Sequence, residues 1–169
     1  MTDVLNGLAA FIWVLTALLP WQPWRSRELL DADSLETLDL SDITVIIPAR
    51  DEADVIGATL QALKQQGQGL HIILVDDEST DGTADIARKV ELENLQIIRS
   101  EPLPSGWTGK LWAQEQGLQV VQTSLVLLLD ADILLKPGLV SALKAKRAGS
   151  RYFCESLFWA SQPKQAAKT

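Results

Sequence analysis

The sequence predicts an α/β fold with a mainly parallel sheet, and three observations support this prediction. Short aliphatic or β-branched runs begin near residues 43, 71, 95 and 125, as expected for strands that are buried on both faces of a sheet. Segments with helical spacing of apolar residues lie between these runs. The strands recur every 24 to 30 residues, which is typical of βαβ units joined by right-handed crossovers.

Each element can be placed by its pattern and by the residues that end it. Gly67 and Gly69 end the first helix of the fold, and Pro137 stands at the first turn of the last helix. The strands are expected at residues 43–48, 71–76, 95–99 and 125–130, and the helices at 52–66, 81–92, 109–121 and 137–146.

The N-terminal segment is apolar and is predicted to be a transmembrane helix. No charged residue occurs from Val4 to Trp24, and about 20 such residues span a bilayer. Arg25 and Arg27 follow, so the positive-inside rule places the rest of the chain in the cytoplasm. Residues 1–27 are therefore expected to form a single membrane anchor and residues 28–42 an acidic linker. An amphipathic helix in the membrane interface is the alternative, and the features of a cleaved signal peptide are absent.

Composition excludes several classes of site. Hydrophobic residues make up 47% and charged residues 22% of the 169 residues, which indicates a globular chain. The net charge is −7 and no dense Lys/Arg stripe occurs, so no nucleic acid is expected as a partner. Cys154 and His71 are the only residues of their types, which excludes zinc sites built from several cysteines or histidines.

Carboxylates follow three of the four expected strands. The first strand leads to Arg50, Asp51 and Glu52, the second to the stretch 76–81 (DDESTD), and the fourth to 130–132 (DAD). Because ligands bind beyond the carboxyl ends of strands in open parallel sheets, we expect these side chains to share one edge. Clustered carboxylates repel each other unless they are hydrogen-bonded, protonated or bridged by a cation. The sequence therefore predicts a cation-dependent site at that edge.

Asp130 and Asp132 are the candidate metal ligands. In an extended strand, residues two apart point to the same side, and two carboxylates suit Mg²⁺ or Mn²⁺ that completes its shell with phosphate and water. A solvated turn is the alternative for this pair. The acids of the second stretch have another alternative, since Ser79, Thr80 or Asp81 can cap the following helix.

These segments together resemble family 2 glycosyltransferases of the GT-A fold. Residues 46–52 (IIPARDE), 75–83 (VDDESTDGT) and 129–132 (LDAD) match the motifs of that family in order and spacing. Residues 102–113 (PLPSGWTGKLWA) are similar to a stretch of the hopanoid-associated glycosyltransferases, relatives of the ceramide glucosyltransferases.

The resemblance implies a Rossmann-like GT-A half-domain over residues 43–147 that binds a nucleotide-sugar, with a UDP-sugar as the favoured donor. The nucleoside pocket would contain Pro48, Ala49 and Glu52, with Arg50 contacting the ligand or pairing with an acid. Asp76 or Asp77 would bind the base, and Lys110 the diphosphate. Asp130 would reach the ribose or the metal, and Asp132 would bind the metal.

The resemblance ends before the features that such enzymes carry after their DAD motif: an acceptor-binding region, a carboxylate base and a Gln/Arg-x-x-Arg-Trp motif. Residues 148–169 are interpreted as an atypical tail, and the chain as cut short, so the catalytic base is left unassigned. The predicted function is metal-dependent glycosyl transfer to a lipid acceptor at the cytoplasmic face of the membrane. Two alternatives stay open: a non-catalytic domain that only binds nucleotide, and a phosphatase of the haloacid dehalogenase type. The second is disfavoured because Leu134 occupies the place of its usual Thr or Val.

Overall fold

The computed structural model describes residues 2–18, 39–149 and 158–160. The chain divides into two compact units, Met1–Leu30 and Asp31–Thr169. The predicted linker 28–42 and tail 148–169 lie for the most part outside the described residues, as do the residues expected to flank a membrane span, from Trp21 to Arg27.

The first unit contains one described helix, α1 (Thr2–Leu18). Its 17 residues extend about 26 Å at 1.5 Å per residue, which is less than the roughly 30 Å of a bilayer core. The described part of the chain contains no helix that could span a bilayer. The transmembrane helix predicted within residues 1–27 is therefore not found there.

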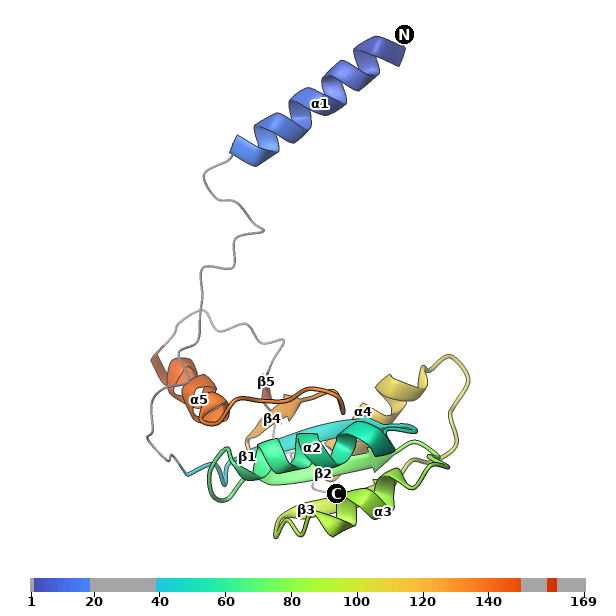
Figure 1. Cartoon of the computed structure of the whole chain (residues 1–169), viewed down its shortest axis with the longest axis vertical. Helices are drawn as coiled ribbons and strands as arrows, with labels where there is room; N and C mark the ends of the chain where they lie inside the picture. The colour runs from blue at the N-terminus through green and yellow to red at the C-terminus, as the bar shows by residue number, and fades with distance from the viewer. Residues whose placement is uncertain (1, 19–38, 150–157, 161–169) are drawn as a thin grey trace, which may run out of the picture. The chain divides into compact units, whose positions relative to one another are not determined.

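The second unit is built on a five-stranded sheet (Figure 1). Its strands are β1 (Ile43–Ala49), β2 (His71–Asp76), β3 (Leu95–Arg99), β4 (Leu125–Leu128) and β5 (Phe158–Ala160). Their spatial order is β3-β2-β1-β4-β5, and the first four run parallel while β5 pairs antiparallel with β4. The predicted parallel α/β fold is confirmed, and all four predicted strands are present.

The four predicted helices of this unit are also present, as α2 (Ala53–Lys64), α3 (Thr83–Lys89), α4 (Gly109–Gln119) and α5 (Leu139–Gly149). Helix α2 packs beside α3, and α4 packs on β1 and β2. Ile46, Val75 and Ala113 are buried in one cluster between α4 and the sheet. Because side chains alternate across a strand, Val45 and Ile47 lie on the opposite face of β1, and both are fully buried.

Gly117 allows helix α4 to pack close to the sheet. A Cβ atom at this position would lie 2.6 Å from Ile46 Cγ2 and 3.2 Å from Val75 Cγ2. Only a residue without a side chain fits such an approach. The close packing of α4 matters for function because the same helix begins at the edge where the strands end.

The strand order creates a crevice at that edge. From β1 the chain moves outward through β2 to β3, and then returns to place β4 on the other side of β1. This reversal is a topological switch point, where open parallel sheets bind their ligands. The fold thus predicts a site between the carboxyl ends of β1 and β4.

Candidate functional site

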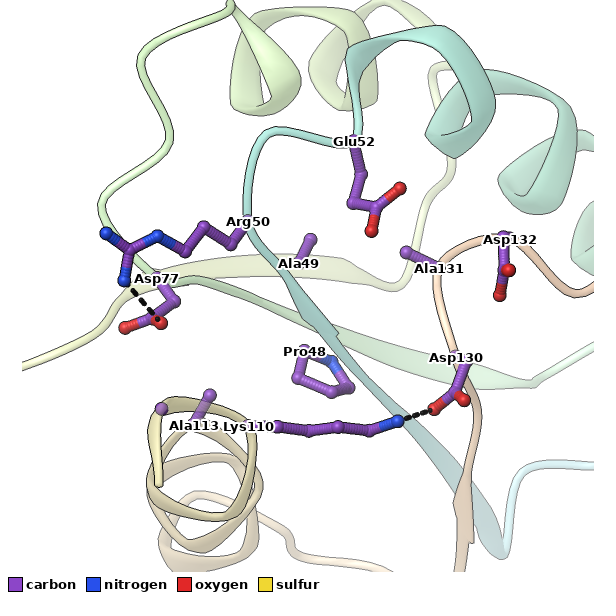
Figure 2. Close-up of a pocket in the computed structure, with 11 residues that line it drawn as sticks. Pro48, Ala49, Arg50, Glu52, Asp77, Lys110, Ala113, Asp130, Ala131 and Asp132 are labelled. Carbon is purple, nitrogen blue, oxygen red and sulfur yellow. Dashed lines mark hydrogen bonds and ion pairs between the residues drawn. The ribbon is translucent and has the colours of Figure 1, made fainter. Parts of the chain in front are cut away.

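A pocket of about 450 Å³ opens at the switch point. Its size lies within the usual range of ligand-binding clefts, about 300–1,000 Å³. The last residues of β1 and the segments after β1, β2 and β4 line it together with the first turns of α4, as Figure 2 shows. The lining residues are Pro48, Ala49, Arg50, Glu52, Asp77, Gly109, Lys110, Ala113, Asp130, Ala131 and Asp132.

The pocket brings together every predicted site residue except Asp76. Asp132 lines the same pocket as Asp77 and Glu52, which is the arrangement that a shared site at one sheet edge requires. Four carboxylates and two cationic side chains thus meet in one cleft, and they come from four separate segments of the chain.

Asp76 and Asp77 have different positions. Asp76 is the last residue of β2, and its Oδ1 accepts the backbone N–H of Ser79 at 3.1 Å, which closes a local turn. Asp77 lies in the pocket, with 13% of its side chain exposed. Of the two residues that the sequence proposes for the same role, the structure therefore places only Asp77 at the site.

The Asp77 carboxylate lies between Arg50 and the start of α4. Arg50 Nη1 is 3.4 Å from Asp77 Oδ2, and the arginine side chain is 62% exposed. A Cβ on Gly109 would lie 2.8 Å from the same oxygen. Glycine at the first position of α4 therefore leaves the space that Asp77 occupies.

A second ion pair crosses the pocket. Lys110, on the first turn of α4, places its Nζ 2.7 Å from Asp130 Oδ1. Both side chains are about half exposed, 57% and 50%. The lysine reaches past Pro48 from α4 to the segment after β4 (Figure 2), so one cationic group joins the two walls of the pocket.

Asp130 and Asp132 reach the pocket from a turn, and the prediction of an extended strand through residue 130 is wrong. Strand β4 ends at Leu128, and Ile133 N–H donates to the Asp130 carbonyl at 3.3 Å. The turn is anchored by buried Thr59 of α2, whose hydroxyl donates to the Ala131 carbonyl at 2.6 Å. The turn bends the backbone out of the sheet, so strand alternation does not explain why both carboxylates line the pocket.

The β2–α3 segment holds the β1–α2 loop in place. Asp51 N–H donates to Ser79 Oγ at 3.0 Å, and Thr80 N–H donates back to Asp51 Oδ1 at 2.8 Å. Asp51 has a positive φ of 54°, which costs conformational energy for a residue with a side chain. These reciprocal bonds stabilise the loop that carries Arg50 into the pocket.

Asp81 makes the other link between these loops. Its carboxylate accepts the backbone N–H groups of Ala53, at 2.8 Å, and of Thr83, at 3.0 Å, together with the Thr83 hydroxyl. These hydrogen bonds, the Thr83 side chain first, lower the pKa of the Asp81 carboxyl. The N-cap of α3 is Gly82 rather than the predicted Ser79, Thr80 or Asp81, but the Asp81 carboxylate accepts N–H groups at the starts of both α2 and α3.

The donor set fits a hard divalent cation that is held only partly by protein. In the described residues no three His, Cys, Asp or Glu side chains are close enough to form a metal site by themselves. Asp130 and Asp132 offer carboxylate oxygens in one pocket. Mg²⁺ is commonly bound by one or two carboxylates and completes its shell with substrate phosphates and water.

Sequence reasoning did not identify the residues that support the site. Thr59 lies on the apolar stripe of α2 with Ile56 and Leu60, all fully buried, and a polar residue on such a stripe signals a buried hydrogen bond. Gln116 of α4 similarly accepts the Glu101 N–H at 2.6 Å and donates to Ser100 Oγ at 2.8 Å. It fixes the loop that precedes Lys110.

A family model, Glycosyl transferase family 2, matches residues 44–154. This is about two thirds of the 169-residue chain. The match extends past residue 147, the expected end of the resemblance, and includes the first residues of the expected atypical tail.

Curated relatives match at about one third identity. A 4,4'-diaponeurosporenoate glycosyltransferase from Staphylococcus aureus is 34% identical over 133 residues, which is 79% of this chain and 34% of that protein. The protein of the same name from Staphylococcus haemolyticus is 33% identical over 113 residues, which is 66% of this chain and 30% of that protein. The chain spans about a third of the length of these relatives. Their names do not confirm the hopanoid-associated subgroup suggested by residues 102–113.

Solved structures agree on the fold. The mannosyltransferase PcManGT from Pyrobaculum calidifontis, in complex with GDP-Man and Mn²⁺, superposes with a TM-score of 0.54 at 26% identity and covers 65% of this chain and 33% of that chain. TarS from S. aureus in complex with UDP gives a TM-score of 0.56 at 25% identity, with 64% and 32% coverage.

Proposed function

The chain belongs to glycosyltransferase family 2, and on this premise we propose that its pocket binds a nucleoside-diphosphate sugar together with a divalent cation, as the donor site of a glycosyltransferase. One observation carries the proposal: four carboxylates and two cationic groups converge at the switch point of a parallel sheet. Solved relatives bound to UDP, or to GDP-Man with Mn²⁺, support the class of ligand.

The nucleoside would lie against Pro48, Ala49 and Asp77. Two of these residues are small and apolar, and they form a surface on which a base can pack, while the carboxylate of Asp77 accepts hydrogen bonds. Arg50 holds that carboxylate from the solvent side at 3.4 Å. A base with N–H groups on its edge fits this arrangement, and uracil carries one such group.

The diphosphate would lie near the start of α4. The first N–H groups of a helix and the positive end of its dipole favour anions. Lys110 adds a full charge on the same turn, and its Nζ extends into the pocket. Because the protein is acidic overall, with a net charge of −7, these local cationic groups are needed to hold an anionic donor.

The divalent cation would be held by Asp130 and Asp132. When bound, it would neutralise the charge that develops on the diphosphate as the glycosidic bond breaks. The residues of this chain would orient the donor, with Asp77 at the nucleoside end and Lys110 at the diphosphate. The donor sugar would then be fixed for attack by an acceptor hydroxyl in line with the leaving group.

We further propose that the acceptor is a lipid at the cytoplasmic face of the membrane. Two observations support this. Residues 102–113 resemble the corresponding stretch of glycosyltransferases that act on lipids. In addition, α1 exposes large apolar side chains, including Phe11 at 64% and Trp13 at 76%, as a helix that binds a lipid surface does. Binding of the full chain to liposomes, compared with a Phe11→Asp/Trp13→Asp variant, tests the membrane association on which this part of the proposal depends.

Calorimetric titration of UDP into the full chain with Mn²⁺ tests the donor site. We expect the wild-type chain to bind UDP in the presence of Mn²⁺, and Asp132→Ala to weaken this binding at least tenfold because one cation ligand is removed. Asp85→Ala is the matched control, since it removes an exposed carboxylate of α3 that pairs with Arg88 outside the pocket. No binding by the wild type, or equal binding by Asp132→Ala, would contradict the proposal.

A further inference from the structure

Lys110 and Asp130 form an ion pair with each other, although each is expected to bind a different part of the ligand. Lys110 Nζ and Asp130 Oδ1 are 2.7 Å apart. In the proposed function, Asp130 holds a divalent cation and Lys110 holds the diphosphate. Neither group can serve its ligand fully while it is paired with the other, because a close charged contact takes up the same donor and acceptor positions.

The other charged side chains of the pocket do not separate Lys110 from Asp130. Arg50 is paired with Asp77 on the opposite side (Figure 2). Within the described part of the chain, the Glu52 and Asp132 side chains make no ion pair, and Lys110 is the cationic lining residue that is not paired with Asp77. Without ligand, the pocket therefore favours Lys110 in contact with Asp130.

The pair is nevertheless suited to exchange. Its side chains are 57% and 50% exposed, and exposed ion pairs contribute little because water screens them and both side chains lose freedom. A divalent cation carries twice the charge of the lysine and outcompetes it for a carboxylate. A diphosphate likewise offers Lys110 more negative charge than one carboxylate does.

We propose that Lys110 is an exchangeable counter-ion of Asp130. In the empty pocket it neutralises Asp130, and on donor binding it moves to the diphosphate while the divalent cation takes its place at Asp130. This inference rests on the proposed donor site and adds a coupling between the two ligands. Because such coupling is reciprocal, the cation promotes diphosphate binding by releasing Lys110, and the diphosphate promotes cation binding in the same way.

The first test measures UDP binding to the full chain by calorimetry in EDTA. Asp130→Asn releases Lys110, whereas Asp132→Asn removes the same charge from the same pocket and leaves the Lys110–Asp130 pair intact. We expect Asp130→Asn to bind UDP about three- to tenfold more tightly than Asp132→Asn without metal. In the background of Lys110→Met this difference disappears, since no lysine is left to release.

The second test measures Mn²⁺ binding without nucleotide. Lys110→Met removes the competitor for Asp130 and is expected to tighten Mn²⁺ binding about two- to fivefold. Lys89→Met, which removes the same charge from the last turn of α3, controls for the change in net charge and is expected to have a smaller effect. With UDP and Mn²⁺ together, Lys110→Met is expected to weaken UDP binding, so one substitution changes the two affinities in opposite directions.

The outcomes separate this inference from the donor site itself. If the wild-type chain binds UDP with Mn²⁺, but Asp130→Asn and Asp132→Asn have equal affinities in EDTA or neither binds, the exchange is overturned and the donor site stands. The exchange is also overturned if Lys110→Met and Lys89→Met bind Mn²⁺ equally. A wild-type chain that binds no UDP under either condition overturns the donor site, and the exchange with it.

Discussion

The hydroxyl of Thr59 donates a hydrogen bond of 2.6 Å to the carbonyl of Ala131. Thr59 is fully buried in α2, and Ala131 is the middle residue of the turn that carries Asp130 and Asp132. The bond joins residues 72 positions apart in sequence. The position of the two candidate cation ligands therefore depends on a core helix as well as on their own strand.

Replacing Thr59 by Val is expected to destabilise the fold by about 1–3 kcal/mol, because the substitution keeps the shape but leaves a buried carbonyl unsatisfied. It is also expected to weaken UDP binding in the presence of Mn²⁺, since the turn loses its anchor. Urea unfolding and calorimetry measure the two effects. Thr59→Ser keeps the hydroxyl and serves as the control. If Thr59→Val retains wild-type UDP affinity, the anchor is not needed for the site.

Replacing Gly109 by Ala is expected to weaken UDP binding about tenfold, because the new Cβ would lie 2.8 Å from Asp77 Oδ2 and push this carboxylate from its position. Calorimetry with Mn²⁺ measures the effect. In an Asp77→Ala background the colliding oxygen is gone, so Gly109→Ala is expected to cause no further loss. An equal loss in both backgrounds would show that Gly109 acts in some way other than by leaving space for Asp77.

Replacing Gly117 by Ala is expected to lower the free energy of unfolding by about 1–2 kcal/mol. Overpacking of a core costs about 1–3 kcal/mol, and the higher helix propensity of Ala offsets up to about 1 kcal/mol of this. The collision is with Ile46 Cγ2, at 2.6 Å. Gly57→Ala in α2 is the matched control, since its Cβ would meet only Ile86 Cγ2, at 3.3 Å, and a smaller loss is expected in urea unfolding.

The hydrogen bonds to Asp81 predict how stability depends on pH. Because the Thr83 side chain and the Ala53 N–H lower the pKa of this carboxyl in the folded state, the unfolded chain binds the proton more readily, with a pKa of about 3.9. The resulting stabilisation is present above about pH 4 and is lost as the pH falls through the lower folded pKa. Asp81→Asn is expected to be less stable at neutral pH and to lose less stability on acidification.

Thermal unfolding measured between pH 2 and pH 7 checks this prediction. The difference in unfolding temperature between the wild type and Asp81→Asn should shrink as the pH falls below about 4. A difference that stays constant across the range would mean that the charge of Asp81 does not contribute through these hydrogen bonds.

Much of the fold follows from local patterns. The run of buried residues from Ile43 to Ile47 and the breaks at Gly67 and Gly69 are sufficient to locate β1 and the end of α2. The convergence of Glu52, Asp77 and Asp132 also follows, because parallel strands place their carboxyl ends at one edge. Parallel strands must be joined by a long crossover, usually a helix. The long segments between the strands therefore made the parallel arrangement predictable.

Other features could not be predicted because they depend on contacts between distant segments. The strand alternation expected for Asp130 and Asp132 failed since β4 ends at Leu128, two residues before the motif. In a turn, two residues with this spacing can also face one pocket. The residue pattern alone does not distinguish a turn from an extended strand. The transmembrane helix within residues 1–27 was expected because the segment is apolar. An apolar composition does not determine how long a helix is.

The parallel α/β fold and the edge where the acidic motifs meet could be predicted because they follow from periodicity and from residues close together in the chain, and the family was indicated by the resemblance of those motifs. Three other features were not predictable in this way: Asp77 lines the pocket while Asp76 closes a turn, Thr59 anchors the Asp130–Asp132 turn, and Lys110 pairs with Asp130. Each of these depends on the distance between side chains from different elements. That distance is set by how closely helices such as α4 pack on the sheet, and a one-dimensional pattern does not contain it.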